Sequence, residues 1–123
     1  MKSIPRISDA EWTVMKVLWT RSPLPASDII AALAHSEQWA PKTVKTLLNR
    51  LVKKGALGFA KEGRAYLYRP LISEAASTTA ASEAFLARVF GGSLRPMLAH
   101  FVGEKRLSAK EVKELKRLLD EET

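Results

Sequence analysis

The sequence predicts a mainly α-helical fold with one small β-hairpin, and three observations predict it. Apolar residues recur at helical spacing through most of the chain. Two extended stretches, 57–61 and 64–69, follow each other closely and are typical of a hairpin. After Pro70 only helical patterns remain. We therefore expect two regions, residues 1–70 with mixed structure and residues 71–123 with helices alone.

Start and stop signals delimit the first two helices. Ser8 and Glu11 have the spacing of a capping box, in which each side chain bonds the other residue's backbone amide, so a helix should begin there. Pro23 and Pro25 should end it, because proline lacks the amide that a helix needs. A shorter helix should then cover residues 26–34, where apolar side chains recur on one face.

A third helix and the hairpin follow. Pro41 suits the first turn of a helix because that position needs no amide donor, and Gly55 suits the residue just beyond the end. Glu62 and Gly63 separate the two extended stretches and are expected to form the turn. Glutamate fits a tight primed turn less well than asparagine or aspartate, so a loop longer than two residues stays open.

Helices alone are predicted beyond the hairpin. One should open at Ser73 and end at a pair of glycines, residues 91–92. Another should cover residues 93 to about 102. A second capping box, within residues 108–111, should open a last helix that ends near Asp120. The C-terminal region is therefore expected to be entirely helical.

The excess of positive charge is confined to the first part of the chain. The net charge of the whole chain is +7. Residues 1–70 hold twelve Lys and Arg against five Asp and Glu, whereas residues 71–123 hold eight against eight. A charge that only kept the protein in solution would have no reason to be confined to one part. The distribution therefore indicates a surface for a polyanion.

Several classes of function are excluded by what the sequence lacks. It has no cysteine, which rules out disulfides, thiolate metal sites and thiol catalysis and fits a cytoplasmic protein. His35 and His100 lack the spacing of metal ligands, and no glycine-rich phosphate loop occurs. We expect no metal, no cofactor and no enzymatic activity. No segment approaches the roughly 20 apolar residues of a membrane span, so we expect no membrane insertion.

The third predicted helix carries the strongest functional signal. Val44, Leu48 and Leu51 lie on one apolar face, and basic and polar residues lie opposite. Residues 41–54 hold five Lys and Arg and no acid, whereas a merely solvated face usually mixes both signs. Lys and Arg neutralise DNA phosphates, and Thr and Asn can hydrogen-bond base edges in the major groove. We assign the groove face to Lys42, Thr43, Lys45, Thr46 and Asn49, and phosphate contacts chiefly to Arg50, Lys53 and Lys54.

Helix, helix, basic helix and hairpin in this order make a winged helix-turn-helix, in which the hairpin is the wing lying against the DNA backbone. Lys61 and Arg64 flank its tip and suit phosphate contact, although charges at these positions equally well protect an exposed strand edge. Tyr66 and Tyr68 share one face of their strand. We expect these two rings to pack the wing onto the core.

The partner that these features predict is double-stranded DNA. We expect sequence-specific binding, because Thr and Asn on the basic face add little to phosphate affinity but can read bases. The alternative is a non-specific architectural DNA-binding protein, for which the basic part of the chain would suffice. A pure protein-interaction module would leave the acid-free helix unexplained.

Three stretches of the sequence together resemble the penicillinase-repressor family of BlaI and MecI type. They are residues 7–15 (ISDAEWTVM), 42–51 (KTVKTLLNRL) followed by 53–55 (KKG), and 66–68 (YLY), and the likeness extends through residues 90–92 (FGG) to the C-terminal helix. The resemblance implies a winged-helix transcriptional repressor connected with antibiotic resistance. It also implies a homodimer that binds a palindromic operator, with the C-terminal helices at the dimer interface.

Apolar residues of the C-terminal region fit a dimer. Phe85 and its neighbours form an apolar cluster at the end of a long helix. In a free-standing monomer this cluster would need a partner surface, and self-association supplies one. We assign the dimer core to Leu86, Val89, Phe90, Leu115, Leu118 and Leu119.

The resemblance also implies a way to release the operator. In this family a membrane sensor with a metalloprotease domain leads to cleavage of the repressor in its dimerisation region. The matching bond lies at His100-Phe101, and family members that are cut have Asn before the Phe. Release by cleavage, by a ligand or by a partner therefore stays open. Copper-responsive relatives carry a C-terminal cysteine cluster, which this chain lacks.

Overall fold

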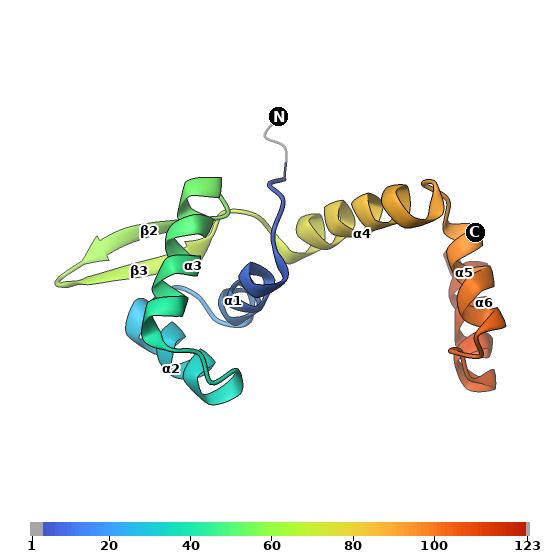
Figure 1. Cartoon of the computed structure of the whole chain (residues 1–123), viewed down its shortest axis with the longest axis horizontal. Coiled ribbons are helices and arrows are strands. Elements are labelled where there is room, and N and C mark those ends of the chain that lie inside the picture. The colour runs from blue at the N-terminus through green and yellow to red at the C-terminus, as the bar shows by residue number, and fades with distance from the viewer. Residues whose placement is uncertain (1–3, 123) are drawn as a thin grey trace. The chain divides into compact units, whose positions relative to one another are not determined.

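The computed structural model describes residues 4–122 and confirms a mainly helical fold with a small antiparallel sheet. The chain forms two compact units that meet between Ala81 and Ser82. This boundary lies inside one helix, α4 (Glu74–Phe90), whereas the pattern of elements led us to expect it after Pro70. Figure 1 shows the elements of each unit.

Three helices form the body of the first unit. They are α1 (Asp9–Thr20), α2 (Ala26–Ser36) and α3 (Pro41–Lys54). The predicted capping box opens α1: Ser8 Oγ accepts from the Glu11 amide at 3.2 Å, and Glu11 Oε1 accepts from the Ser8 amide at 2.8 Å. The start of α1 is therefore defined by side-chain bonds as well as by packing.

A short turn joins α2 to α3. α2 continues past its predicted end at Ala34, because His35 and Ser36 keep helical geometry although they add nothing to the apolar pattern. Gln38 then takes a left-handed backbone φ of 60°, which helps to end α2 before the chain enters α3. α3 ends as predicted at Gly55, whose φ of 81° suits a residue without a β-carbon.

The core of the first unit lies between the three helices and the base of the sheet. The apolar face predicted for α3 is buried in it, and Trp19 and Trp39 pack against it from outside. The position of α3 is therefore fixed along its whole length. The buried apolar residues are Val14, Met15, Leu18, Leu24, Ile29, Leu33, Val44, Leu47, Leu48, Leu51, Ala56 and Leu57.

A three-stranded antiparallel sheet in the order β1-β3-β2 completes the first unit. β2 (Leu57–Glu62) and β3 (Ala65–Pro70) form the predicted hairpin, which lies beside α3 in Figure 1. β1 (Leu24–Pro25) pairs with β3 and was not predicted. A strand of two residues, one of them proline, is too short to show the alternation by which a strand is recognised.

The turn of the hairpin lies one residue later than predicted. Glu62 pairs with Ala65, so the two loop residues are Gly63 and Arg64. Gly63 has a φ of 61° at the first loop position, where a II′ turn places glycine. The expected Glu62-Gly63 turn was wrong because it would have put glutamate, which has a β-carbon, at this position. Arg64 therefore lies in the turn itself.

The segment that follows β3 packs on the helices of the first unit. The Trp19 indole donates to the Ile72 carbonyl at 3.0 Å, and Lys16 forms an ion pair with Glu74. Ser77, near the start of α4, is buried, and its hydroxyl donates to the carbonyl of Ser73 at 2.8 Å. The first turns of α4 thus belong to the first unit, which the sequence pattern alone did not reveal.

The second unit contains the rest of α4, with α5 (Leu94–Gly103) and α6 (Ala109–Glu122). α4 ends as predicted before residues 91–92, the two glycines, which both have positive φ. The predicted second capping box is present: the side chains of Ser108 and Glu111 accept from each other's amides at 3.1 and 3.0 Å. The region is helical as expected, and no side chain between residues 82 and 122 is buried.

Candidate nucleic-acid interface

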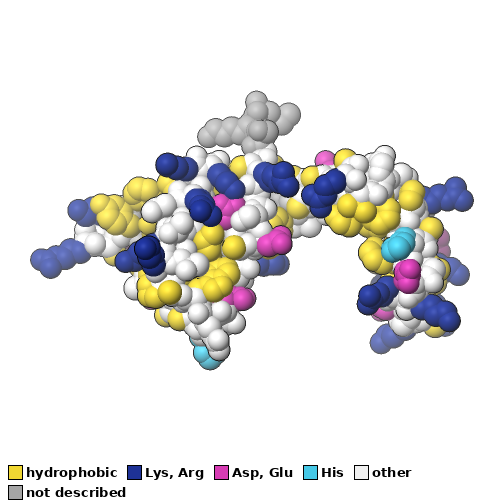
Figure 2. Space-filling view, in the orientation of Figure 1, with side chains coloured by type: hydrophobic (Ala, Val, Ile, Leu, Met, Phe, Trp, Pro, Cys, Tyr) yellow, Lys and Arg dark blue, Asp and Glu magenta, His cyan; other side chains and the backbone are white. Residues whose placement is uncertain are grey.

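The exposed face of α3 gathers nearly all the residues that the sequence assigned to DNA. The opposite side of the helix is held in the core by Val44, Leu48 and Leu51. Figure 2 shows Lys and Arg side chains over α3 and at the tip of the hairpin. This face is positively charged and is carried on a rigid element. The exposed residues of α3 that the sequence assigned to DNA are Lys42, Thr43, Lys45, Thr46, Asn49, Arg50, Lys53 and Lys54.

Thr46 uses one of its hydrogen-bonding groups within α3. Its hydroxyl donates to the Lys42 carbonyl one turn earlier, at 3.0 Å. The hydroxyl oxygen keeps free lone pairs, and the residue as a whole is exposed. Thr46 can therefore accept a hydrogen bond from a base amino group or touch a thymine methyl, but it cannot donate without giving up the bond to Lys42.

Lys54 differs from the other cations of α3. Its ammonium donates to Glu11 Oε1 at 2.5 Å and to the Arg6 carbonyl at 2.9 Å. Its side chain is 35% exposed, while that of Glu11 is 2% exposed. The ammonium is thus directed at the protein. A partner 43 positions earlier in the sequence cannot be seen from the periodicity of one helix.

Glu11 is a buried carboxylate at the start of α1. Burial acts to raise its pKa, but the hydrogen bonds from Lys54 and from the backbone and hydroxyl of Ser8 outweigh it. Together they hold the pKa of Glu11 below its ordinary value, so the group is ionised at neutral pH. Its other oxygen, Oε2, is buried and has no hydrogen-bond partner among residues 4–122.

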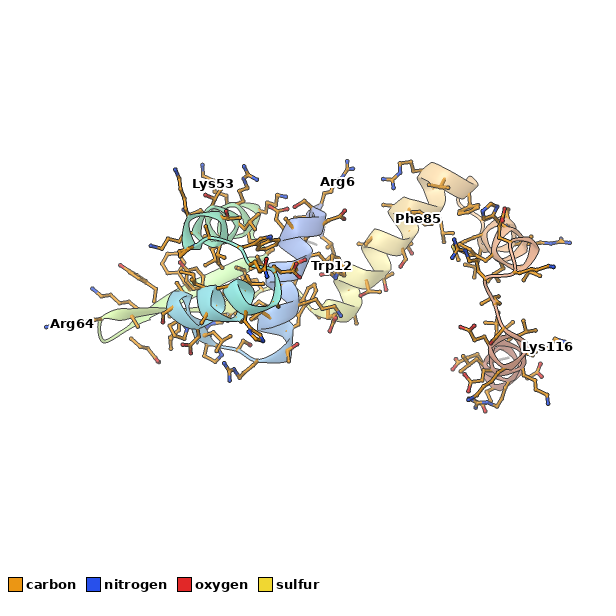
Figure 3. The ribbon with its side chains drawn as sticks, turned by 60° about the horizontal axis from the view of Figure 1, so that its bottom comes forward. Arg6, Trp12, Lys53, Arg64, Phe85 and Lys116 are labelled. Atoms are coloured by element: carbon orange, nitrogen blue, oxygen red, sulfur yellow. The ribbon has the colours of Figure 1, made fainter. Side chains whose placement is uncertain are left out.

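The wing carries the two cations expected near its tip. Figure 3 shows Arg64 at the end of the hairpin, pointing away from the fold, and Lys53 pointing outward from α3. Lys61 pairs across the hairpin with Tyr66, and its Nζ lies 6.0 Å from the centre of that ring. The cations of the wing and of α3 therefore lie on neighbouring elements of one unit.

An open groove of about 480 Å³ separates α3 from the wing. Tyr68 packs against the core as expected, but Tyr66 packs on Phe59 instead and stays 48% exposed. The sequence pattern placed both tyrosines on one face of β3 but could not show that only the inner one reaches the core. The groove is lined by Asn49, Val52, Lys53, Phe59, Tyr66 and Tyr68.

The residues assigned to a dimer core lie on the helices of the second unit. Val89, Leu118 and Leu119 are about half exposed, and Leu86, Phe90 and Leu115 are partly buried. The ring of Phe90 contacts those of Phe85 and His100, at 5.8 and 6.2 Å between centres. These residues form apolar surfaces within the second unit.

The bond between His100 and Phe101 lies inside α5. The His100 carbonyl accepts from the Glu104 amide and the Phe101 carbonyl accepts from the Arg106 amide, both at 3.0 Å. Within residues 4–122 there is no group of three or more His, Cys, Asp or Glu that could hold a metal ion. No helix over the same residues has the length and hydrophobicity needed to cross a bilayer.

Comparison with known proteins gives relatives along nearly the whole chain. The family model described as "Penicillinase repressor" matches residues 7–121. The penicillinase repressor of Bacillus licheniformis is 44% identical over 98% of this chain and 94% of its own length. The methicillin resistance regulatory protein MecI of Staphylococcus aureus strain N315 is 33% identical over 93% of each chain.

A solved structure resembles more than half of the chain. The solution structure of monomeric B. licheniformis BlaI in complex with the blaP half-operator has a TM-score of 0.55 and 50% sequence identity. The match covers 62% of this chain and 93% of that one. With its winged-helix fold and its family match over residues 7–121, this chain belongs to the penicillinase repressor family, whose members are DNA-binding transcriptional repressors rather than enzymes.

Proposed function

We propose that this protein represses transcription by binding, as a homodimer, a two-fold symmetric operator in double-stranded DNA. The observation that carries the proposal is the exposed, acid-free face of α3 beside the wing, in a chain that belongs to a repressor family. α3 is long enough, and free enough on one side, to enter the major groove. The protein acts in the cytoplasm, where its operator lies.

Base reading and phosphate binding fall to different side chains. Thr46 and Asn49 are short and exposed, so they contact base edges, with Lys42, Thr43 and Lys45 at the same groove face. Phosphates are held by Arg50 and Lys53 and, from the wing, by Lys61 and Arg64. We leave Lys54 out of this set because its ammonium already bonds Glu11 and the Arg6 carbonyl.

A second copy of the chain is the partner that best suits the second unit. No side chain within residues 82–122 is buried, so these helices have no closed core of their own. Val89 and Leu118 are about half exposed and would be covered by the same surfaces of another copy. Joining two recognition helices raises the effective concentration of the second, which a single small winged helix needs for tight, specific binding.

Loss of the second unit would then release the operator. The bond at His100-Phe101 is the candidate for a cut made downstream of a membrane sensor metalloprotease, as the resemblance implies. Because this bond lies within α5, a protease could reach it only after local unwinding of that helix. Incubation with such a protease, followed by mass measurement of the fragments, tests the position of the cut.

The proposal is tested by selecting bound DNA from a random pool. We expect an enriched motif with two inverted half-sites about one or two helical turns apart. Insertion of about five base pairs between the half-sites should nearly abolish binding, because it rotates one half-site to the far side of the duplex. Enrichment of no motif would instead favour a non-specific architectural protein.

A further inference from the structure

The groove between α3 and the wing leaves two aromatic rings partly uncovered. Phe59 is 51% exposed and Tyr66 is 48% exposed, although the first unit has a well-formed core nearby. The groove is open, and its lining contains the cation Lys53 but no acid. Exposed apolar surface grouped in this way, with a polar rim, marks a surface that something else covers.

The rings of the wing form one cluster with a fixed geometry. Phe59 meets Tyr66 edge to face, with 5.4 Å between ring centres and 82° between planes. Phe59 also meets Tyr68 at 5.8 Å, and Tyr68 packs against the core. The exposed rings of Phe59 and Tyr66 are therefore held in place through Tyr68, which packs against the core. Because they are already ordered, covering them loses little conformational entropy.

The place of the groove indicates its occupant. In a winged helix the recognition helix enters the major groove while the wing lies against the backbone beside it. Whatever strand borders the major groove on the wing side must therefore pass between α3 and the wing. This strand offers deoxyribose, which is apolar, and phosphates, which are anionic. The groove offers aromatic rings, with Lys53 on the α3 side and Lys61 near the ring of Tyr66.

We infer that this groove seats one sugar-phosphate strand of the operator, with Phe59 and Tyr66 against deoxyribose and with Lys53 and Lys61 on the flanking phosphates. The inference rests on the proposed DNA binding and adds a binding site for one strand of the DNA, the groove between α3 and the wing. A second copy of the chain fits the groove less well, because the chain carries a net charge of +7 and would meet cations with cations.

Two substitutions of Tyr66 test the contact by competition titration against specific and non-specific DNA. Tyr66→Thr removes the ring and keeps a good strand former, so affinity should fall roughly five- to thirtyfold for all sequences alike. The salt dependence should not change, because no phosphate-binding charge is lost. Tyr66→Phe keeps the ring and should bind as the unchanged protein does. Ala65→Thr, on the opposite face of β3, is the matched control and should also bind normally.

Hydroxyl-radical footprinting reads the seat directly, since hydroxyl radicals attack exposed deoxyribose. At saturating protein we expect Tyr66→Thr to lose protection at one or two sugars in each half-site and to keep the protection around α3. An unchanged footprint with unchanged affinity would overturn the seat while leaving DNA binding intact. Absence of any footprint for the unchanged protein would instead overturn the proposed function. A shift of Tyr66→Thr to monomer in sedimentation without DNA would identify a second copy as the occupant and also overturn the seat.

Discussion

Lys54 at the end of α3 and Glu11 in the first turn of α1 form an ion pair, with Nζ 2.5 Å from Oε1. The pair connects the C-terminal end of α3 to the start of α1. The positive charge also lies where the dipole of α3 favours a cation. The sequence suggested that Lys54 binds phosphate, but in the structure its ammonium links α3 to α1.

Glu11→Gln should lower the free energy of unfolding of the first unit by about 1–3 kcal/mol, because the amide leaves the Lys54 ammonium without its anion. Lys54→Met should cost more, since it leaves a charged carboxylate buried without its main partner. Denaturant unfolding followed by tryptophan fluorescence measures this, because Trp12, Trp19 and Trp39 all lie in the first unit. Additive losses in the double variant would show that the two side chains do not stabilise each other.

Stability should fall in acid because of the same carboxylate. The pKa of Glu11 is lowered in the folded state, so below its unfolded value of about 4.3 the unfolded chain binds more protons than the folded one. The contribution of Glu11 is therefore complete above that pH and is lost as the pH falls through the folded pKa. Unfolding measured from pH 7 down to pH 3 should show a smaller decline for Glu11→Gln. Glu111→Gln is the control and should decline as the unchanged protein does. Glu111 belongs to the exposed second capping box in the other unit, and tryptophan fluorescence does not follow unfolding of that unit.

Lys53 and Lys54 are neighbours with different expected effects on DNA binding. Lys53→Met should lower the slope of log affinity against log salt by about one unit, because it removes an outward-pointing cation that we propose to bind a phosphate. Lys54→Met should leave the slope unchanged, because its ammonium is already paired with Glu11. Titrations from low to high salt decide between them. A slope lowered equally in both variants would mean that Lys54 leaves Glu11 and binds phosphate in the complex.

Thr46 offers a test of base reading with matched variants. Thr46→Val keeps the methyl group and removes the hydroxyl, whereas Thr46→Ser does the reverse. If the hydroxyl accepts from a base, Thr46→Val should lose about 1–3 kcal/mol on the selected site and little on random DNA. If the methyl group contacts thymine, Thr46→Ser should show the loss instead. Competition against random DNA measures both, and a uniform loss on all sequences would show that Thr46 does not read bases.

A fragment that ends at Ala81 should fold, whereas one that ends at Pro70 should be less stable by at least about 2 kcal/mol. The shorter fragment loses the partly buried Ile72 and its bond to the Trp19 indole. Both should be monomers that bind DNA weakly and with strong salt dependence. Sedimentation and thermal unfolding of the two fragments provide the check. Equal melting temperatures would show that residues 71–81 do not stabilise the first unit.

Much of the architecture could be predicted because it depends on local signals. The two capping boxes, Pro41, Gly55 and the glycines after α4 all act within one or two turns of a helix. The apolar stripe of α3 likewise shows in the sequence which side is buried and which side is free. Periodicity therefore identifies the exposed side of α3, and the assignment of that side to DNA stays a proposal.

The features that were missed depend on residues far apart in the sequence. β1 exists only through pairing with β3, and Lys54 turns inward only because Glu11 is buried beside it. The role of the first turns of α4 is set by Trp19 and Lys16 on α1. The aromatic groove likewise arises from residues of α3, β2 and β3 together. No pattern within a single element contains this information.

The short β1 divides the hairpin into two parts that should open at different rates. β1 reaches β3 only at Leu67 and Tyr68, so the sheet is three-stranded in the middle of the hairpin and is a two-stranded ribbon from Lys61 and Tyr66 to the tip. Two strands alone are at best marginally stable in water. Amide hydrogen exchange should accordingly be fast around Arg64 and slow around Leu67 and Tyr68. The tip should then open and reclose while the core stays intact, which would let the phosphate contact that we propose for Arg64 adjust to DNA of differing groove width.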